Sequence, residues 1–280
     1  MKPKVIVILG QTATGKSALA VKIAKKVGGE IISADSRQVY KKLDIGTGKI
    51  TKKEMRGISH HLIDVANPKT NFTIAQYKEL AFKIIKEIIA RGKTPIICGG
   101  AGFYIEAITR GVIFPEVPPN LKLRKKLGLL SAIALFSTLK KLDLERTNNI
   151  DPQNKVRLIR AIEIAKALGK VPPITETIPP YEFIKIGLYL TSDKLKKKVK
   201  KRVKKMFQAG LLNEIKKLKK TGISNKRFSE FGFEYFNPTY EKVVAETLKY
   251  AKRQMTWFKR DKQIKWFDAS KKITYKNKSI

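Results

Sequence analysis

The sequence predicts an α/β protein in which a parallel sheet is flanked by helices. Short apolar runs, for example at 5–9 and 94–98, have the composition of strands that are buried on both faces. Longer segments with apolar residues at helical spacing, such as 73–90, separate these runs. A glycine-rich turn joins the first run to the first such segment. Strands that alternate with helices in this way are typical of a parallel sheet.

The composition argues against a membrane-spanning or disulfide-stabilised protein. The chain has 280 residues, 42% of them hydrophobic, but no apolar run approaches the ~18 residues that a membrane span requires. The first apolar run ends at Leu9 and does not have the form of a secretory leader. The single cysteine, Cys98, excludes an intrachain disulfide, and the two adjacent histidines, His60 and His61, argue against a zinc site. We therefore expect a cytoplasmic protein.

The chain is strongly basic, with a net charge of +37 and a pI near 10.2. Such a charge favours a polyanionic partner, above all a nucleic acid. Residues 191–280 hold 27 basic and 8 acidic side chains, so the last third is the most basic part. Only 12 of the 60 basic residues are arginine. Compositional bias toward lysine is therefore the alternative explanation.

The turn after the first predicted strand matches the pattern G-x-x-x-x-G-K-[ST]. Its residues are Gly10, Gln11, Thr12, Ala13, Thr14, Gly15, Lys16 and Ser17. Glycines let successive backbone N–H groups point inward, and the following helix adds positive potential at its N-terminus. Lys16 supplies a charge for the outer phosphates, and the Ser17 hydroxyl can hold Mg²⁺. The sequence thus predicts a P-loop for a di- or triphosphate; the alternative is a helix-opening turn that binds nothing.

Asp35 follows the second predicted strand, at 30–34. Ligands of open α/β sheets lie beyond the carboxyl ends of the strands, so we expect Asp35 to face the same crevice as the P-loop. A carboxylate there suits an acceptor substrate that gives up a proton, and Ser36, Arg37 and Gln38 add polar groups. The alternative is an aspartate that only caps a turn.

The strand at 94–98 ends in Cys98-Gly99-Gly100, where NTPases commonly carry an acidic residue that helps to hold Mg²⁺. A motif for recognition of the guanine base is also missing. The P-loop therefore need not serve the hydrolysis of ATP or GTP.

Prolines divide the chain. Pro115, Pro118 and Pro119 precede a mostly helical segment that ends near Pro179 and Pro180. We predict a core like that of P-loop NTPases, formed by 1–115 and 181–280, and a helical insertion at 116–180. The other elements that we predict are a short strand at 60–65, helices at 121–142 and 154–168, a strand at 183–190, and basic helices at 194–220 and 241–260.

The last of these helices interleaves basic and aromatic residues from Lys252 to Arg260. Such interleaving is common in nucleic-acid contacts. Trp257 and Phe258 fit the protein core equally well.

Several stretches together resemble the tRNA dimethylallyltransferases, also called tRNA isopentenyltransferases. The matching stretches are GQTATGKS at 10–17, DSRQVYKKLDIGTGK at 35–49, HHLID at 60–64, GGAGFYI at 99–105, RLIRAIE at 157–163, RVKKMFQAGLLNE at 202–214 and AKRQMTWFKRD at 251–261. Their order and spacing match over nearly the whole chain. The P-loop occurs in many families, whereas the DSRQVY, double-histidine and RQMTWF stretches are far more specific.

The resemblance implies transfer of a dimethylallyl group from dimethylallyl diphosphate to the exocyclic amine of the adenosine on the 3′ side of the anticodon in tRNA. The P-loop, with Lys16 and Mg²⁺ near Ser17, would hold the prenyl diphosphate. By the same resemblance Arg202 is a further cation, and Asp35 takes the proton of the adenine amine. Ser36, Arg37 and Gln38 would then hold the flipped base or its neighbours.

The resemblance also implies that the insertion grips the anticodon stem-loop. Arg157 and Arg160 match a tRNA-contacting segment, and Arg124 is a further candidate. Ala101 stands in a tRNA-contacting stretch where the family usually has threonine, and Gln11 replaces the usual proline. The zinc finger of the eukaryotic members is missing, which indicates a bacterial type. We expect a monomer that does not associate with membranes.

Two other functions fit part of the sequence. A P-loop kinase of a nucleoside or small metabolite explains the P-loop and Asp35, but not the basic last third. A non-catalytic RNA-binding protein explains the charge, but not the intact Lys16, Ser17 and Asp35.

Overall fold

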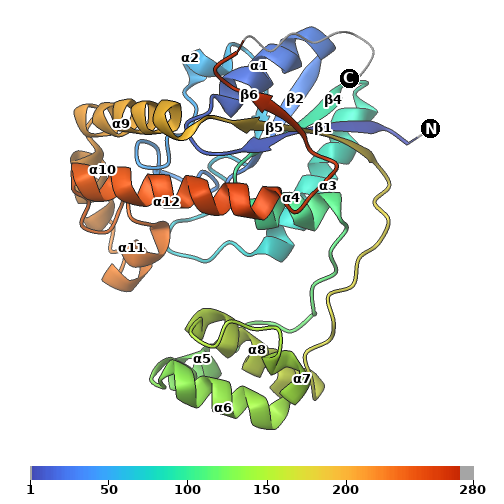
Figure 1. Cartoon of the computed structure of the whole chain (residues 1–280), viewed down its shortest axis with the longest axis vertical. Coiled ribbons are helices and arrows are strands. Elements are labelled where there is room, and N and C mark those ends of the chain that lie inside the picture. The colour runs from blue at the N-terminus through green and yellow to red at the C-terminus, as the bar shows by residue number, and fades with distance from the viewer. Residues whose placement is uncertain (1, 272–280) are drawn as a thin grey trace. The chain divides into compact units, whose positions relative to one another are not determined.

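The computed structural model describes residues 2–271, which divide into two compact units (Figure 1). Among the described residues, unit 1 comprises 2–111 and 178–271, and unit 2 comprises Val112–Thr177. Each unit has its own apolar core, so each is described by itself.

Unit 1 is built on a parallel sheet, as the sequence predicts. The strands are β1 (Lys4–Gly10), β2 (Gly29–Ala34), β3 (His60–His61), β4 (Thr94–Gly99), β5 (Glu182–Tyr189) and β6 (Lys265–Asp268). Within residues 2–271 their order across the sheet is β3-β2-β4-β1-β5-β6, and every pair is parallel. The central position of β1 places the P-loop, which follows it directly, in the middle of the carboxyl edge.

Helices lie on both faces of this sheet, with α1 (Lys16–Val27) on one face and α3 (Ile74–Ala90) on the other (Figure 1). The other helices of unit 1 are α2 (Lys52–Met55), α4 (Gly102–Thr109), α9 (Ser192–Gln208), α10 (Leu211–Lys219), α11 (Asn225–Phe231) and α12 (Tyr240–Phe258). Because side chains alternate across a strand, neighbours in β1 enter different cores. Ile6 packs with Val21 of α1, whereas Val7 belongs to a larger cluster with Ile85 of α3. No helix of the described residues is both long and apolar enough to cross a membrane.

Two long predicted helices are each broken in the structure. The segment 194–220 forms α9 and α10, because Gly210 adopts the left-handed region with φ 94° and begins a new helix. The segment 121–142 forms α5 (Leu121–Gly128) and α6 (Ala132–Leu142). There the Ser131 hydroxyl accepts a hydrogen bond from the backbone N–H of Ala134, which caps the start of α6. Apolar spacing alone predicted one helix in each case.

The predicted strand at 60–65 is also wrong in its length. Only His60 and His61 pair with β2, since Leu62 and Asp64 both have positive φ angles. His61 Nε2 lies 2.7 Å from Glu30 Oε2, and Arg91 and Lys93 bond the same carboxylate. Burial raises the pKa of Glu30, but these partners outweigh it and hold the pKa at about 2. His61 thus packs against an ion-pair cluster at the sheet, whereas His60 bonds the carbonyl oxygen of Ile58.

Unit 2 is a small helical body. It contains α5, α6, α7 (Leu144–Thr147) and α8 (Lys155–Leu168). The core forms where α6 packs on α8, through Leu135, Leu139, Leu158 and Ile162. Helices with one apolar face stabilise each other in this way.

Candidate active site

The P-loop connects β1 to α1. At its first residue, Gly10, the backbone has a conformation that only glycine adopts readily. Gly10 has φ 125°, and a Cβ atom there would collide with the carbonyl oxygen of Leu188 in β5. Side chains brace the loop from within. The Thr14 hydroxyl donates to the carbonyl oxygen of Gln11 at 2.8 Å, and Gln11 Oε1 accepts from the backbone N–H of Leu190 at 3.1 Å. Gln11 is therefore buried as a link between the loop and β5.

Lys16 is the cation of this loop. Its Nζ donates to the carbonyl oxygen of Gln11 at 2.6 Å. Burial of the ammonium group lowers the pKa of Lys16 to about 8, with the nearby Arg202 guanidinium acting in the same direction. An anion beside Lys16 would favour the charged form. The loop thus holds a cation whose charge depends on what is bound.

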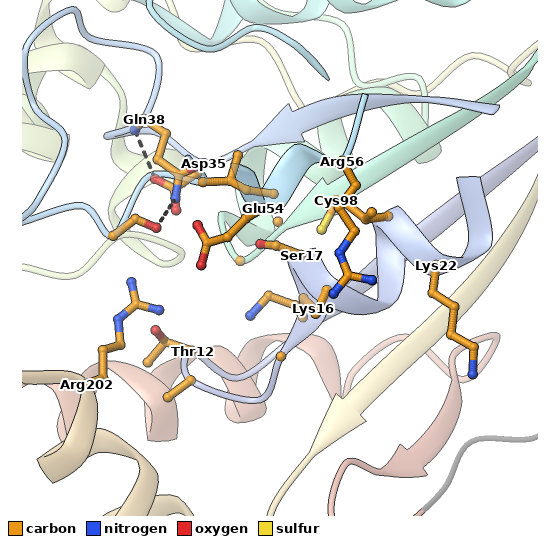
Figure 2. A pocket seen from close by; sticks show the side chains of 18 of the residues that line it. Thr12, Lys16, Ser17, Lys22, Asp35, Gln38, Glu54, Arg56, Cys98 and Arg202 are labelled. Carbon is orange, nitrogen blue, oxygen red and sulfur yellow. Dashed lines mark hydrogen bonds between the residues drawn. The ribbon is translucent and has the colours of Figure 1, made fainter. Parts of the chain in front are cut away.

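A cavity of about 900 Å³ opens above the P-loop. Of the residues that the sequence predicts for the site, it is lined by Thr12, Ala13, Gly15, Lys16, Ser17, Asp35, Gln38 and Arg202. These come from the P-loop, the end of β2 and α9, which are far apart in the chain. Figure 2 shows the side chains of Lys16, Arg202 and Glu54 reaching toward the same space. The expectation that Asp35 faces the same crevice as the P-loop is confirmed.

The remaining predicted residues of unit 1 lie outside the cavity lining. Gly10, Gln11 and Thr14 fix the backbone of the P-loop through the contacts described above. Ala101 caps α4 without a side-chain bond, and its N–H donates to the carbonyl oxygen of Ala34 at 3.1 Å. Ser36 and Arg37 belong to the turn that follows Asp35.

Asp35 combines both of the roles that the sequence left open. Its Oδ1 accepts hydrogen bonds from the backbone N–H groups of Arg37 at 2.9 Å and Gln38 at 3.3 Å, so it does organise a turn. Among residues 2–271, no hydrogen-bond partner is seen for Oδ2. One carboxylate oxygen is thus held by the backbone, and the other is available to a ligand.

Arg202 enters the cavity from α9 beside the loop 44–49. One of its terminal nitrogens donates to the carbonyl oxygen of Thr47 at 3.1 Å, and Gln38 Nε2 donates to the same oxygen at 3.3 Å. Burial lowers the pKa of Arg202 from its usual value, although a guanidinium remains charged. No carboxylate of the described residues forms an ion pair with Arg202. Arg202 is half-buried, and Asp35, Glu234 and Glu54 act on it only at longer range. A guanidinium without a direct carboxylate partner suits an anionic ligand.

Sequence reasoning missed several residues of the cavity. Gln254 of α12 accepts from the backbone N–H of Thr12 at 2.7 Å and donates to the carbonyl oxygen of Gly100 at 2.9 Å. Tyr250, one turn earlier, donates to the same oxygen at 3.3 Å. Gln254 lies in the RQMTWF stretch. The only indication of its role in the sequence was that this stretch is specific to the family. Trp257 of that stretch packs against the core and Phe258 is buried in it, so these two aromatic residues serve the fold.

Two carboxylates that the sequence did not indicate, those of Glu54 and Glu234, act electrostatically on Arg202. Glu234 does not line the cavity. Glu54 lines the cavity from α2 and also caps that helix through Thr51. Burial raises the pKa of Glu234 to about 7, against the influence of Arg202 and Arg37. Glu234 therefore gains negative charge as the pH rises through about 7.

Two of the three predicted arginines of unit 2, Arg124 and Arg160, form a structural cluster with Glu163. Arg124 binds the buried carboxylate of Glu163 through two nitrogens, at 2.9 and 2.7 Å, and Arg160 binds it at 2.5 Å. Both arginines keep about a third of their side chains exposed. Arg157, on the same helix as Arg160, is exposed.

The residues present fit Mg²⁺ bound together with a phosphate group. No cluster of three or more His, Cys, Asp or Glu side chains within residues 2–271 forms a metal cage. Mg²⁺ usually keeps several waters and takes only one or two protein ligands in addition to phosphate oxygens. Ser17, exposed in the cavity at the start of α1, is the residue that would hold the ion.

The pKa of Lys16 leads to a pH prediction for anion binding. Lys16 is protonated below about pH 8 and loses its charge above it. We therefore expect the affinity for inorganic pyrophosphate to fall as the pH rises from 7 to 9.5, and binding at pH 9 to take up a proton. Calorimetry in two buffers of different ionisation enthalpy measures both quantities. Equal affinity and no proton uptake across this range would contradict the prediction.

The fold and the site together define a class. A P-loop at the centre of a parallel sheet, facing a carboxylate and a guanidinium across a cavity, is the architecture of a P-loop enzyme that acts on a phosphorylated donor. Residues 38–261 match the model of the IPP transferase family. The chain belongs to the IPP transferase family.

Individual relatives agree with this assignment. The chain is 38% identical to a tRNA dimethylallyltransferase of Anoxybacillus flavithermus, over 96% of this chain and 91% of that protein. It is 40% identical to the enzyme of the same name from Caldanaerobacter subterraneus, over 98% and 95%. The crystal structure of a tRNA isopentenylpyrophosphate transferase from Bacillus halodurans superposes with a TM-score of 0.71, at 35% identity over 96% of this chain and 90% of that one. A eukaryotic dimethylallyltransferase acting on tRNA gives 0.83, at 28% identity over 95% and 74%.

Proposed function

We propose that this protein is a tRNA dimethylallyltransferase of the bacterial type. It transfers a dimethylallyl group from dimethylallyl diphosphate to the exocyclic amine of the adenosine 3′-adjacent to the anticodon. The observation that carries the proposal is the single cavity lined by the P-loop, Asp35 and Arg202. Membership of the IPP transferase family and the names of the relatives support the transfer of a dimethylallyl group to tRNA. A tRNA substrate fits a protein that works in the cytoplasm.

The donor diphosphate binds in the P-loop. The C–O bond between the allylic carbon and the diphosphate breaks, and its electron pair leaves with the diphosphate. Negative charge therefore develops on the leaving group, where P-loop N–H groups, Lys16 and Arg202 stabilise it. Bound at Ser17, Mg²⁺ would neutralise part of the same charge.

The acceptor is held at the other side of the cavity. As the new N–C bond forms, the exocyclic amine loses a proton, and Asp35 accepts it through the oxygen that the turn leaves available. The adenine must leave the stack of the anticodon loop to reach Asp35, at a cost of a few kcal/mol. We propose that Ser36, Arg37 and Gln38 hold the flipped adenine or its neighbouring bases.

Unit 2 is the part that we assign to the anticodon stem-loop. Arg157 is exposed and suited to a phosphate contact. Arg124 and Arg160 first serve the buried Glu163, but their exposed portions leave N–H groups for the same purpose. Ala101, at the start of α4, lacks the hydroxyl that the family usually has there, so only its backbone and methyl group can contact the tRNA. We propose that the protein acts as a monomer.

Product analysis tests the function directly. Purified protein is incubated with Mg²⁺, dimethylallyl diphosphate and unmodified tRNA, and the digested nucleosides are analysed by mass spectrometry. We expect an adenosine that is heavier by one dimethylallyl group. A bound tRNA without product would contradict the proposal. ATP-dependent phosphorylation of a small molecule would instead support the kinase that the P-loop alone also allowed.

A further inference from the structure

The loop 44–49 is held by a residue that lies far from it in the chain, Glu214 of α10. Glu214 Oε2 accepts hydrogen bonds from the backbone N–H groups of Asp44 at 3.1 Å and Ile45 at 2.8 Å. Its Oε1 accepts from the N–H of Gly46 at 3.2 Å and from the Tyr235 hydroxyl at 2.8 Å. One carboxylate thus binds three consecutive backbone amides and a buried phenol.

The next residues of this loop position Arg202. The carbonyl oxygen of Thr47 accepts from Arg202 at 3.1 Å. Gly48 has φ 58°, and a Cβ atom there would collide with the Arg202 guanidinium. The loop backbone therefore fixes one side of the guanidinium and leaves its other nitrogens to the cavity.

We infer that Glu214 is a positioning residue for Arg202: it fixes the loop whose carbonyl oxygen orients the guanidinium toward the diphosphate. The inference rests on the proposed function of the site. Glu214 does not line the cavity, so it acts on the donor only through this loop. A carboxylate is needed because an amide side chain cannot accept hydrogen bonds at both ends.

The shape of the loop supports the same assignment. At Gly46 a Cβ atom would lie 2.6 Å from the ring of Tyr235, so the loop backbone packs directly against the aromatic side chain that also bonds Glu214. Tyr235 is almost fully buried. Burial raises its pKa well above the usual value, and the Glu214 carboxylate acts in the same direction, so the phenol remains a donor to Glu214 at every relevant pH.

A double-mutant cycle tests whether Glu214 acts through Arg202. The variants are Glu214→Gln, Arg202→Ala and the double variant. The matched control is Glu246→Gln, a half-buried glutamate of α12 that pairs with Lys249 and does not line the cavity. Pyrophosphate affinity is measured by calorimetry, and kcat and KM for the donor by product formation. We expect E214Q to lower pyrophosphate affinity and kcat/KM by about 10- to 100-fold, and E246Q by less than about twofold.

The outcome in the Arg202→Ala background decides the inference. If Glu214 works through Arg202, the added E214Q substitution changes either quantity by less than about twofold there. An equal loss in both backgrounds, or wild-type values for E214Q, would overturn the positioning role. Failure of the wild-type protein to transfer the prenyl group would instead count against the proposed function.

A second variant avoids dependence on the folding of E214Q. Gly48→Ala leaves Glu214 intact but places a methyl group against the Arg202 guanidinium. We expect the same loss of pyrophosphate affinity as for E214Q, and again little further loss in the Arg202→Ala background. Wild-type affinity for G48A would show that the loop does not position Arg202.

Discussion

Replacement of Asp35 by asparagine is expected to slow prenyl transfer by about 10²- to 10⁴-fold while tRNA affinity stays within about tenfold. Asparagine still offers Oδ1 to the backbone N–H groups of Arg37 and Gln38, so the turn is retained. The second oxygen becomes an amide nitrogen, which cannot take the proton of the adenine amine. Single-turnover transfer and filter binding of tRNA measure the two quantities separately.

Asp193→Asn is the matched control for Asp35→Asn. Asp193 is an exposed aspartate in the first turn of α9, and it does not line the cavity. Its replacement should change the transfer rate by less than about threefold. A fully active D35N would remove Asp35 from the role of base. A loss of tRNA binding equal to the loss of rate would make Asp35 a binding residue instead.

Replacement of Lys16 by methionine is expected to lower kcat/KM for the donor by about 10²- to 10³-fold. The substitution keeps an unbranched side chain in a half-buried position but removes the charge beside the proposed site of the leaving diphosphate. Pyrophosphate affinity should fall with it, because a hydrogen bond to a charged group contributes about 1.5–3 kcal/mol. Affinity for tRNA should be retained, since Lys16 lies at the donor end of the cavity.

Lys22→Met provides the comparison for Lys16→Met. Lys22 also lines the cavity and lies on the same helix, α1, but it is exposed. We expect a loss of less than about threefold. Similar losses for both variants would mean that the cavity attracts the diphosphate by general charge and that the P-loop lysine has no special role.

The cavity that we propose as the donor site could be predicted from the sequence because its parts are local. The P-loop is eight consecutive residues. Asp35 directly follows the run at 30–34, whose composition predicts a buried strand. The rule that ligands lie at the carboxyl ends of parallel strands then brings the two together. Arg202 was available only through the resemblance, since nothing in its own lysine-rich helix distinguishes it from its neighbours.

The contacts that brace the site could not be predicted, because they join residues that are distant in the chain. Glu214 binds amides about 170 positions earlier, and Gln254 binds Thr12 across 242 positions. Neither residue stands out by type or spacing. The helix breaks at Gly210 and Ser131 were missed for another reason: apolar periodicity continues across both, whereas the backbone turns at each.

The pairing of β1 with β5 has a consequence for how the protein is made. Lys4 lies opposite Glu182 in the sheet, and unit 2 occupies the sequence between them. During synthesis the P-loop leaves the ribosome early, but the strand that should lie beside it follows only after more than half of the chain. Until then the apolar edge of β1 is open, and such an edge pairs readily with other chains. Nascent protein therefore depends on protection from aggregation for longer than a fold of local contacts would.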